Sequence, residues 1–232
     1  MTSRLAAGQE QRRRFLAEIT HELRNPLAIL QSEIEAQLDG VRPRDDRQLA
    51  SLLDETRRLG HLVDDLHTLA LAETGQLVLA FEAVQFGDLV DEVVPRHAVT
   101  AARHDVTLHT TVQPRLPKVW IDPVRIRQVL DNLLTNAIRH APAGGEATVA
   151  VTTSDGTVDC AVTDSGPGFP ADHLDTVLDR FTKSGDSRGS GLGLSIARDL
   201  VEAHHGTITA SNHPATAGAR VSFTLPGGHP GT

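Results

Sequence analysis

The chain has one cysteine in 232 residues, no long apolar run and no excess of basic charge. Cys160 has no second thiol with which to form an internal disulfide, which is typical of proteins in reducing compartments. No apolar run approaches the roughly 20 residues of a membrane span, and residues 1–14 lack the apolar centre of a signal peptide. We therefore expect this stretch to fold in water without disulfides.

The net charge of −8 disfavours DNA or RNA as the main partner, because phosphate backbones are bound by basic surfaces. The one basic run, Arg12–Arg14, is interpreted as a solvated helix face. The length allows one large or two small domains, with enough apolar residues to bury their cores.

Apolar residues recur every three or four positions over residues 9–40 and again after Asp45, which predicts two helices separated by a break at Gly40. The first stripe consists of Ile19, Leu23, Leu27, Leu30, Ile34 and Leu38. The second consists of Leu49, Leu52, Thr56, Leu59, Val63, Leu66 and Ala70, widened by Leu53, Leu62 and Leu69. Because a two-helix hairpin cannot cover stripes this wide, we expect two hairpins to form a four-helix bundle, and hence a homodimer.

Beyond Gly75 the pattern changes to short strands with interspersed helices, which suggests a sheet with helices on one face. The predicted strands are Leu77–Phe81, Val106–Val112, Lys118–Ile121, Ala147–Thr153, Thr157–Thr163, Thr207–Ser211 and Arg220–Leu225. The predicted helices are about 86–103, 122–141 and 191–205. The fold class is therefore α+β, with a helical hairpin over residues 1–75 and a mixed α and β domain over residues 76–232.

His21 lies two positions from the nearest members of the first stripe, so at about 100° per residue it points away from the buried side. Asn25 follows one turn later on the same exposed face, and Glu22 flanks the histidine. One imidazole nitrogen is free to attack, while Glu22 can accept a hydrogen bond from the other N–H and raise nucleophilicity. Most of the other histidines, His97 and His204 among them, are interpreted as surface residues, and none of these has companions at metal-ligand spacing.

Asn132 and Asn136 lie four residues apart on the predicted helix 122–141, so their amides share one face with Arg139. Amide oxygens are hard ligands that suit Mg²⁺, and a guanidinium can face phosphate charge. Two capping or surface amides are a reasonable interpretation of this helix by itself.

Two glycine-containing segments follow. Asp164–Phe169 comes after a predicted strand, and its carboxylate can accept a hydrogen bond from an exocyclic amine while the glycines let a flat base approach. Gly189–Gly193 opens the predicted helix 191–205, where backbone N–H groups can bind phosphate. Its spacing matches neither the dinucleotide fingerprint nor the P-loop, and each segment alone is an ordinary turn or a weak signal.

Five segments resemble, in order, the motifs of the sensor histidine kinases, and together they extend over nearly the whole chain. They are residues 15–27 for the H-box, 127–140 for the N-box, 164–169 for the G1-box, 180–183 for the F-box and 189–193 for the G2-box. The resemblance implies a dimeric four-helix bundle joined to an ATP-binding α/β sandwich of the gyrase, Hsp90 and MutL type.

The resemblance also implies roles for individual residues. In the H-box, His21 is the phospho-acceptor, Glu22 acts in phosphotransfer and Asn25 assists dephosphorylation of the partner. Mg²⁺ is held by Asn132 and Asn136. The residues implied to bind ATP are Asn132, Asn136, Arg139, His140, Asp164, Gly166, Gly168, Lys183, Gly189, Gly191, Leu192 and Gly193. Asp164 is the residue that reads adenine, and Ala171–Arg188 is the lid over ATP.

The sequence departs from the family pattern at three positions. His140 and Thr182 occupy places usually held by aromatic residues, so stacking near the nucleotide is expected to differ. His205 stands where a glycine is common. None of these departures removes a catalytic group.

The implied function is ATP-dependent autophosphorylation of His21, followed by transfer to an aspartate of a response-regulator receiver domain, with regulator phosphatase activity beside it. An alternative is a module that docks the regulator and favours its dephosphorylation through Asn25, with ATP only as a conformational ligand. A third interpretation, an Hsp90- or MutL-like ATPase, shares the nucleotide site but does not explain the exposed His21–Asn25 face.

We expect a cytoplasmic location and no nucleic-acid partner. The short polar segment Met1–Gln11 is similar to the tail of a signal-transmitting helix linker in the family. A parent protein with sensory and membrane segments upstream is therefore expected, with this part on the cytoplasmic side.

Overall fold

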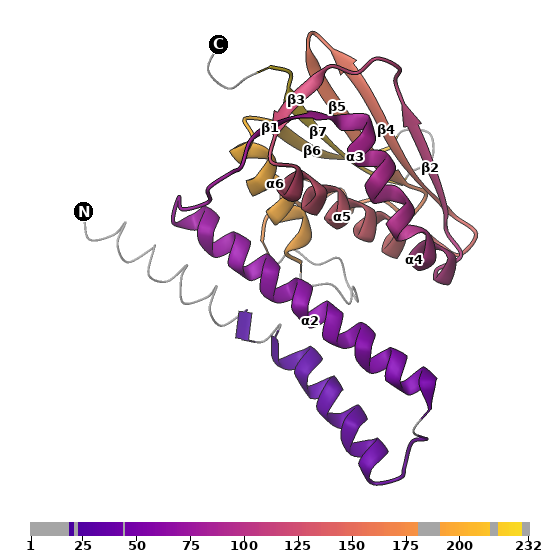
Figure 1. Cartoon of the computed structure of the whole chain (residues 1–232). Helices are drawn as coiled ribbons and strands as arrows, with labels where there is room; N and C mark the ends of the chain where they lie inside the picture. Colours follow the sequence, from indigo (N-terminus) through magenta and orange to yellow (C-terminus); the bar gives the residue numbers. More distant parts are fainter. Residues whose placement is uncertain (1–18, 21–22, 44, 181–190, 214–217, 229–232) are drawn as a thin grey trace. The chain divides into compact units, whose positions relative to one another are not determined.

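The computed structural model describes residues 19–20, 23–43, 45–180, 191–213 and 218–228. The chain divides into two compact units, Met1–Leu71 and Ala72–Thr232. Figure 1 draws the first unit as a helical hairpin and the second as a sheet with helices packed on it. The predicted α+β fold class is confirmed. Among the described residues, no helix combines the length and apolarity needed to cross a bilayer.

The hairpin of the first unit consists of a helix over residues 23–38 and α2 (Asp46–Glu73). The first helix ends at Gly40, whose φ of 72° lies in the left-handed region that glycine adopts without strain. Asp45 caps α2, because its Oδ1 accepts a hydrogen bond of 2.9 Å from the N–H of Gln48. Both predicted helices are therefore present, although the first of them before residue 19 lies outside the described residues.

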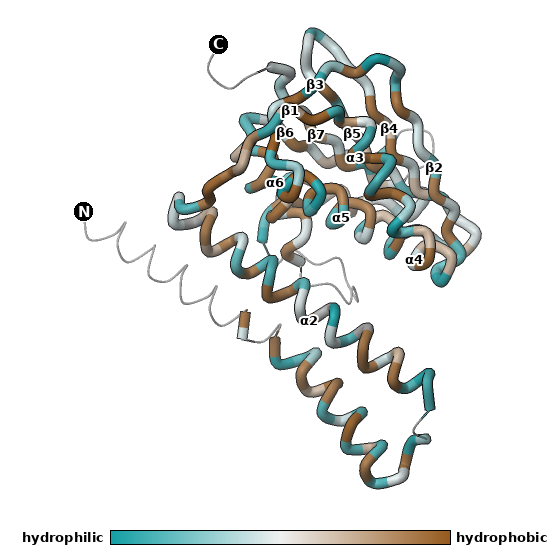
Figure 2. The backbone as a smooth tube through the Cα atoms, viewed as in Figure 1, coloured by the Kyte–Doolittle hydropathy of each residue, from teal (hydrophilic) through white to brown (hydrophobic). Residues whose placement is uncertain are grey.

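Many apolar side chains of the hairpin are exposed. Figure 2 shows hydrophobic positions recurring along both helices. Six members of the predicted stripes are between 46% and 67% exposed: Leu27, Ile34, Leu38, Leu49, Leu53 and Val63. These residues belong to the predicted stripes, so the stripes are wider than one hairpin can bury.

The second unit contains a five-stranded sheet in the order β2-β4-β5-β7-β6 and a separate antiparallel pair, β1 with β3. Within the larger sheet β2 runs parallel to β4, and all other neighbours are antiparallel. The strands are β1 (Glu82–Gln85), β2 (Thr107–Val112), β3 (Lys118–Ile121), β4 (Glu146–Ser154), β5 (Thr157–Asp164), β6 (Thr207–Asn212) and β7 (Ala219–Pro226).

The helices of this unit cover one face of the large sheet (Figure 1). They are α3 (Phe86–Val93), α4 (Ala98–Arg103), α5 (Pro123–His140) and α6 (Gly193–Ala203), with the short 3₁₀ helix η1 (Val94–His97) between the first two. Alternate residues of β4, β5 and β7 point toward the helices and are buried, as the period of two in a strand requires. Each fully buried large apolar side chain contributes about 1.5–3 kcal/mol to stability, so this layer supplies the core.

Two predicted elements were wrong. Leu77–Phe81 is not a strand, because β1 pairs with β3 only over Glu82–Gln85 and the N–H of Ala80 donates to a side chain, Asp122 Oδ2, at 3.0 Å. The predicted helix 86–103 is divided into α3, η1 and α4. Pro95, at the start of η1, has no N–H with which to continue an α-helix.

The C-terminus of α6 provides a test of backbone strain. His205, which follows the helix, has a φ of 60° and is exposed. A left-handed conformation costs a non-glycine residue about 1–2 kcal/mol, and a glycine at this position avoids that cost. Part of the gain is lost again, because glycine gives up more conformational entropy on folding. We expect His205→Gly to raise the free energy of unfolding by about 0.5–1 kcal/mol in urea titrations.

The neighbouring Gly206 is the matched control. A Cβ at this position would lie 2.0 Å from the carbonyl oxygen of Thr224, so Gly206→Ala should destabilise the protein strongly. A loss of stability in His205→Gly would show that the histidine side chain contributes more than its backbone strain removes.

Candidate functional site

Helix α5 carries the candidate site, and the buried residue Asp122 fixes where it begins. Oδ1 of Asp122 accepts hydrogen bonds from the N–H groups of Val124 and Arg125, at 3.0 and 3.1 Å. These two bonds satisfy N–H groups that a helix start leaves unpaired, and Pro123 at the first position has no N–H to satisfy. The cap therefore sets the register of every side chain along α5.

The amide face of α5 meets the start of α6. Asn132 donates from Nδ2 to the carbonyl oxygen of Gly193 at 3.2 Å, across 61 positions of sequence. This bond leaves the amide oxygen of Asn132 as the group available to a cation. Asn136 is half-buried one turn later, and Arg139 is exposed. The opposite face of α5 is buried through Ile126, Val129, Leu130, Leu133, Leu134, Ala137 and Ile138.

Asp164 is held in a buried position at the end of β5. It follows Val158, Cys160 and Val162 on the helix-covered face of the sheet, and it is only 4% exposed. Oδ1 accepts hydrogen bonds from the N–H groups of Gly166, at 2.8 Å, and Ala219, at 3.2 Å. In the described part of the chain, Oδ2 receives no hydrogen bond, so this oxygen is available to an N–H donor of a ligand.

Burial raises the pKa of Asp164, and its hydrogen bonds from Gly166 and Ala219 and the charge of His140 oppose this in part. His140 has the reverse shift: burial is the main cause that lowers its pKa, Arg139 lowers it further, and Asp164 raises it. A neutral imidazole therefore stands near a buried carboxylate. Such a pair of perturbed groups in one place is typical of a binding site.

The G1 segment lies directly against the end of α5. A Cβ on Gly166 would lie 2.4 Å from the carbonyl oxygen of His140, so no other residue fits there without movement of the backbone. Gly168 has a φ of 75°, which also favours glycine. The N-box and the G1-box, which are separate in sequence, are therefore in contact.

Asn212, at the end of β6, is a residue of this site that the sequence analysis did not identify. Its Oδ1 accepts a hydrogen bond from the N–H of Phe169 at 2.7 Å, and its Nδ2 donates to the carbonyl oxygen of Phe169 at 2.8 Å. Both backbone groups of Phe169 are thus held by one side chain 43 positions away. No local pattern could have indicated this pairing, because it depends on how β6 lies beside the G1 segment.

The G2 segment forms the N-terminus of α6. Gly191 has a φ of 69°, Leu192 is buried at the helix N-cap without a side-chain capping bond, and Gly193 is the first helical residue. The helix begins two residues later than predicted. In the part of the chain that the structure describes, the N-cap residue offers no side chain to the first N–H groups of α6, which is the arrangement that binds phosphate at helix starts.

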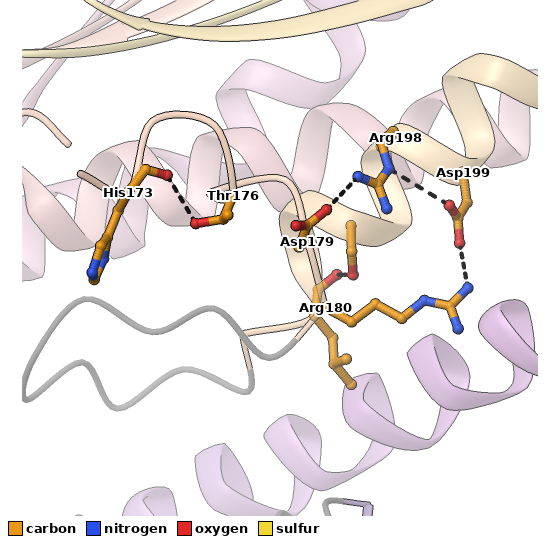
Figure 3. Close-up of polar contacts among 8 residues, drawn as sticks. His173, Thr176, Asp179, Arg180, Arg198 and Asp199 are labelled. Carbon is orange, nitrogen blue, oxygen red and sulfur yellow. Dashed lines mark hydrogen bonds and ion pairs between the residues drawn. The ribbon is translucent and has the colours of Figure 1, made fainter. Parts of the chain in front are cut away.

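Two ion pairs connect α6 to the segment that precedes residue 181. Figure 3 shows Arg180 beside Asp199, with a distance of 3.0 Å from Nη2 to Oδ2, and Arg198 beside Asp179, with 2.8 Å from Nη1 to Oδ1. Partly exposed pairs contribute at most about 1 kcal/mol each, so their effect is mainly to orient this segment. The described part of the predicted lid, residues 171–180, is thereby held at its end on the helix that begins at the G2-box.

Several predicted residues lie outside the described part of the chain: His21, Glu22, Lys183 and Gly189, together with lid residues 181–188. Asn25 is described and lies exposed on the helix 23–38, next to the buried Pro26. No group of three or more His, Cys, Asp or Glu side chains suited to a metal ion occurs among the described residues. Amide oxygens on α5 are thus the candidate metal ligands.

The interpretation of the remaining histidines as surface residues was wrong for two of them. His204 is 1% exposed and hydrogen-bonded through both ring nitrogens. The side chain of His97 is 13% exposed, and its Nε2 lies 2.8 Å from Oδ1 of Asp131 on α5. Sequence alone could not reveal the distant partners, because Asp131 lies 34 positions from His97 and Asp122 lies 82 positions from His204.

Two family models match the chain. The His Kinase A (phospho-acceptor) domain matches residues 11–75, and the histidine kinase-, DNA gyrase B- and HSP90-like ATPase matches residues 121–229. The signal transduction histidine-protein kinase BaeS of Escherichia coli is 36% identical over 231 residues, which cover 97% of this chain and 49% of that kinase. The chain thus spans about half the length of the curated relatives it matches.

Solved structures agree with these matches. The histidine kinase AdeS of Acinetobacter baumannii superposes with a TM-score of 0.74 at 30% identity, covering 90% of this chain and 98% of that one. The histidine kinase ThkA, solved in complex with the response regulator protein TrrA, superposes with a TM-score of 0.72 over 93% of this chain and 61% of that one. At 24% identity the second likeness shows the fold alone.

Asp164 allows nucleotide binding and stability to be separated. Asp164→Asn keeps Oδ1 as an acceptor for Gly166 and Ala219 but removes the charge. We expect at least about tenfold weaker ATP binding in calorimetric titrations, because the replacement amide presents N–H donors where the ligand amine also donates.

The same variant should be at least as stable as the parent at pH 8. The folded-state pKa of Asp164 is raised, so the native carboxyl costs stability as pH rises through that value. The melting-temperature advantage of Asp164→Asn should therefore shrink as pH falls and the native carboxyl becomes protonated. Unchanged ATP affinity in this variant would contradict the assignment of Oδ2 to the ligand.

Asn212 should act on affinity through the G1 segment. Asn212→Ala removes both hydrogen bonds to Phe169, and Asn212→Asp keeps the acceptor but places a carboxylate oxygen against a carbonyl oxygen. We expect calorimetric titrations to show ATP affinity about threefold to tenfold lower in each variant. The aspartate variant should bind ATP more weakly than the alanine variant. Equal affinity in all three proteins would mean that the segment keeps its shape without this residue.

Proposed function

The chain belongs to the sensor histidine kinases, and we propose that it is the kinase core of a two-component system. It transfers the γ-phosphoryl group of ATP to His21 and from there to an aspartate of a response-regulator receiver domain. The observation that carries the proposal is the convergence on α5 of three motifs: Asn132 bonds to Gly193 of the G2-box, and His140 contacts Gly166 of the G1-box. The match of residues 11–75 to the phospho-acceptor family supports a phosphoryl acceptor in the same chain.

The residues around α5 suit the parts of ATP. Oδ2 of the buried Asp164 accepts a hydrogen bond from the exocyclic amine of adenine, while the N-terminus of α6 faces the phosphates. The amide oxygens of Asn132 and Asn136 would hold Mg²⁺, which would neutralise phosphate charge. The remaining contacts assigned to ATP come from Arg139, His140, Gly166, Gly168, Lys183, Gly189, Gly191 and Leu192.

The reaction is a displacement at phosphorus. One nitrogen of the neutral His21 imidazole forms the new N–P bond, and the bond from the γ-phosphorus to the bridging oxygen breaks as ADP leaves. Glu22 accepts a hydrogen bond from the other ring N–H and supports the charge that develops on the ring. An aspartate of the regulator then attacks the phosphohistidine, and His21 leaves with the electron pair of the N–P bond. Positioning and charge neutralisation supply most of the rate enhancement.

The hairpin also provides the dimer. Six apolar side chains that one hairpin leaves exposed can be covered by a second copy, which closes a four-helix bundle. We assign dimerisation and phosphotransfer to residues 1–75, where the phospho-acceptor family match also ends, and ATP binding to residues 76–232.

The exposed Asn25 supports a second activity on the same face. An amide one turn after His21 can orient a water molecule toward the phosphoaspartate of a docked regulator, which would dephosphorylate it. ATP could then act only as a conformational ligand. Rapid regulator dephosphorylation without autophosphorylation would favour this second function over the kinase.

The length comparison supports an inference about location. Because the chain spans about half of the relatives it matches, we infer that sensory and membrane segments precede it in a longer protein and that this part lies in the cytoplasm. Regulator binding is supported by the complex formed by ThkA, a protein of the same fold.

Labelling with γ-³²P ATP and Mg²⁺ tests the kinase. We expect label that is lost in acid and stable in alkali, and its complete loss in His21→Gln, because glutamine offers no nucleophilic nitrogen. The matched control is His61→Gln, a substitution at an exposed position on α2 that should keep the label.

Label that persists in His21→Gln would contradict the assignment of the acceptor. Release of free phosphate with no phosphoprotein at any stage would instead support an Hsp90- or MutL-like ATPase.

A further inference from the structure

The segment that leads out of α2 ends on two buried residues of the ATP-binding unit. Helix α2 ends at Glu73, and residues 74–81, here called the connector, lead to β1. The N–H of Ala80 donates to Oδ2 of Asp122 at 3.0 Å. The ring of Phe81 meets the ring of His204 edge to face, with 5.3 Å between centroids and 62° between planes. The end of the connector is therefore held by Asp122 and His204.

His204 is fixed in one tautomer. Its Nδ1 lies 2.7 Å from the carbonyl oxygen of Leu200 and must donate to it, while Nε2 accepts the backbone N–H of Asp122 at 3.0 Å. Burial lowers the pKa of His204 and thereby favours this neutral form. Of the groups acting on it, the bond to Leu200 and the charge of Asp122 raise the pKa, and His205 lowers it. The ring thus joins three chain segments: the connector, the start of α5 and the end of α6.

The same two helices carry the nucleotide motifs at their other ends. Asp122 and His204 join the start of α5 to the end of α6, and Asn132 joins α5 to the start of α6 at Gly193. Helix α6 has 11 residues, which corresponds to a length of about 16 Å. The connector is thereby attached to the helix pair that would hold ATP, but about one helix length away from the phosphates.

We propose that His204 is a positioning residue for phosphoryl transfer, which holds the connector against the α5–α6 pair so that the ATP-binding unit meets the phospho-acceptor histidine in a defined orientation. The inference rests on the proposed kinase function. His204 touches neither ATP nor His21 in this account and acts through Asp122 and Phe81. Its loss should therefore reduce the rate of transfer and leave ATP affinity nearly unchanged, which a merely structural role would not do.

Three variants test this inference in the full 232-residue chain. His204→Leu removes the acceptor for the N–H of Asp122, His204→Gln restores an acceptor without the ring, and Phe81→Leu keeps apolar bulk without the ring contact. His205→Asn is the matched control, because asparagine tolerates the left-handed backbone of that exposed position. Each protein is titrated with ATP by calorimetry, labelled with γ-³²P ATP, and followed by amide hydrogen exchange.

We expect ATP dissociation constants within about twofold of the parent and labelling rates at least about fivefold lower in His204→Leu and Phe81→Leu. His204→Gln should recover part of the rate. Amide exchange should accelerate at Ala80 and Asp122 but not along the start of α6. His205→Asn should match the parent in rate and affinity.

Two results would overturn the inference. One is an equal fall of affinity and rate, which would show that His204 supports only the fold of the nucleotide site. The other is a parental labelling rate in Phe81→Leu, which decides the matter even where His204→Leu does not fold. If the parent protein itself takes no label, the kinase proposal fails. If amide exchange at Ala80 is unchanged in Phe81→Leu, the contact between Phe81 and His204 does not hold the connector in place.

Discussion

The structure of the ATP-binding unit depends on how one buried carboxylate is satisfied. Asp122 accepts three backbone hydrogen bonds, two from the first turn of α5 and one from Ala80, and its own N–H donates to His204. A buried carboxylate without partners is costly, so these bonds form together or the site is not stable. The start and register of α5, and with them the direction of Asn132, follow from this single residue.

Around α5 the demands of stability and of binding diverge. The helix buries one face against the sheet, while its polar face meets two glycine-containing segments. One of them approaches so closely that Gly166 has no room for a Cβ. Asp164 is the clearest case, because its burial raises its pKa and costs stability at neutral pH, yet a desolvated acceptor is what a hydrogen-bonding ligand needs. Residues such as Asn212 and Ala219, which hold the backbone and carboxylate in place, are therefore part of the site although they need not touch the ligand.

Local patterns in the sequence predicted most of the fold and the motif residues, and long-range contacts account for what they missed. Alternation identified β5 and β7, and the four-residue spacing of Asn132 and Asn136 correctly placed both on one helix. Leu77–Phe81 is an uninterrupted apolar run, which also suits a buried strand, but among the described residues its backbone pairs with no other strand. The roles of His204 and Asn212 depend on partners 82 and 43 positions away, which no window along one sequence contains.

A single ATP site built on α5 is tested most directly by nuclear magnetic resonance of labelled amides during a titration with ATP and Mg²⁺. If α5 assembles the motifs into one ATP site, the side-chain amides of Asn132 and Asn136 and the backbone amides of Gly166 and Gly193 should shift together, with one dissociation constant. The turn at Gly156, at the far end of β5, should not change. A single site on this helix would be contradicted if the amides of Asn132 and Asn136 did not shift. Different dissociation constants for Gly166 and Gly193 would also contradict it.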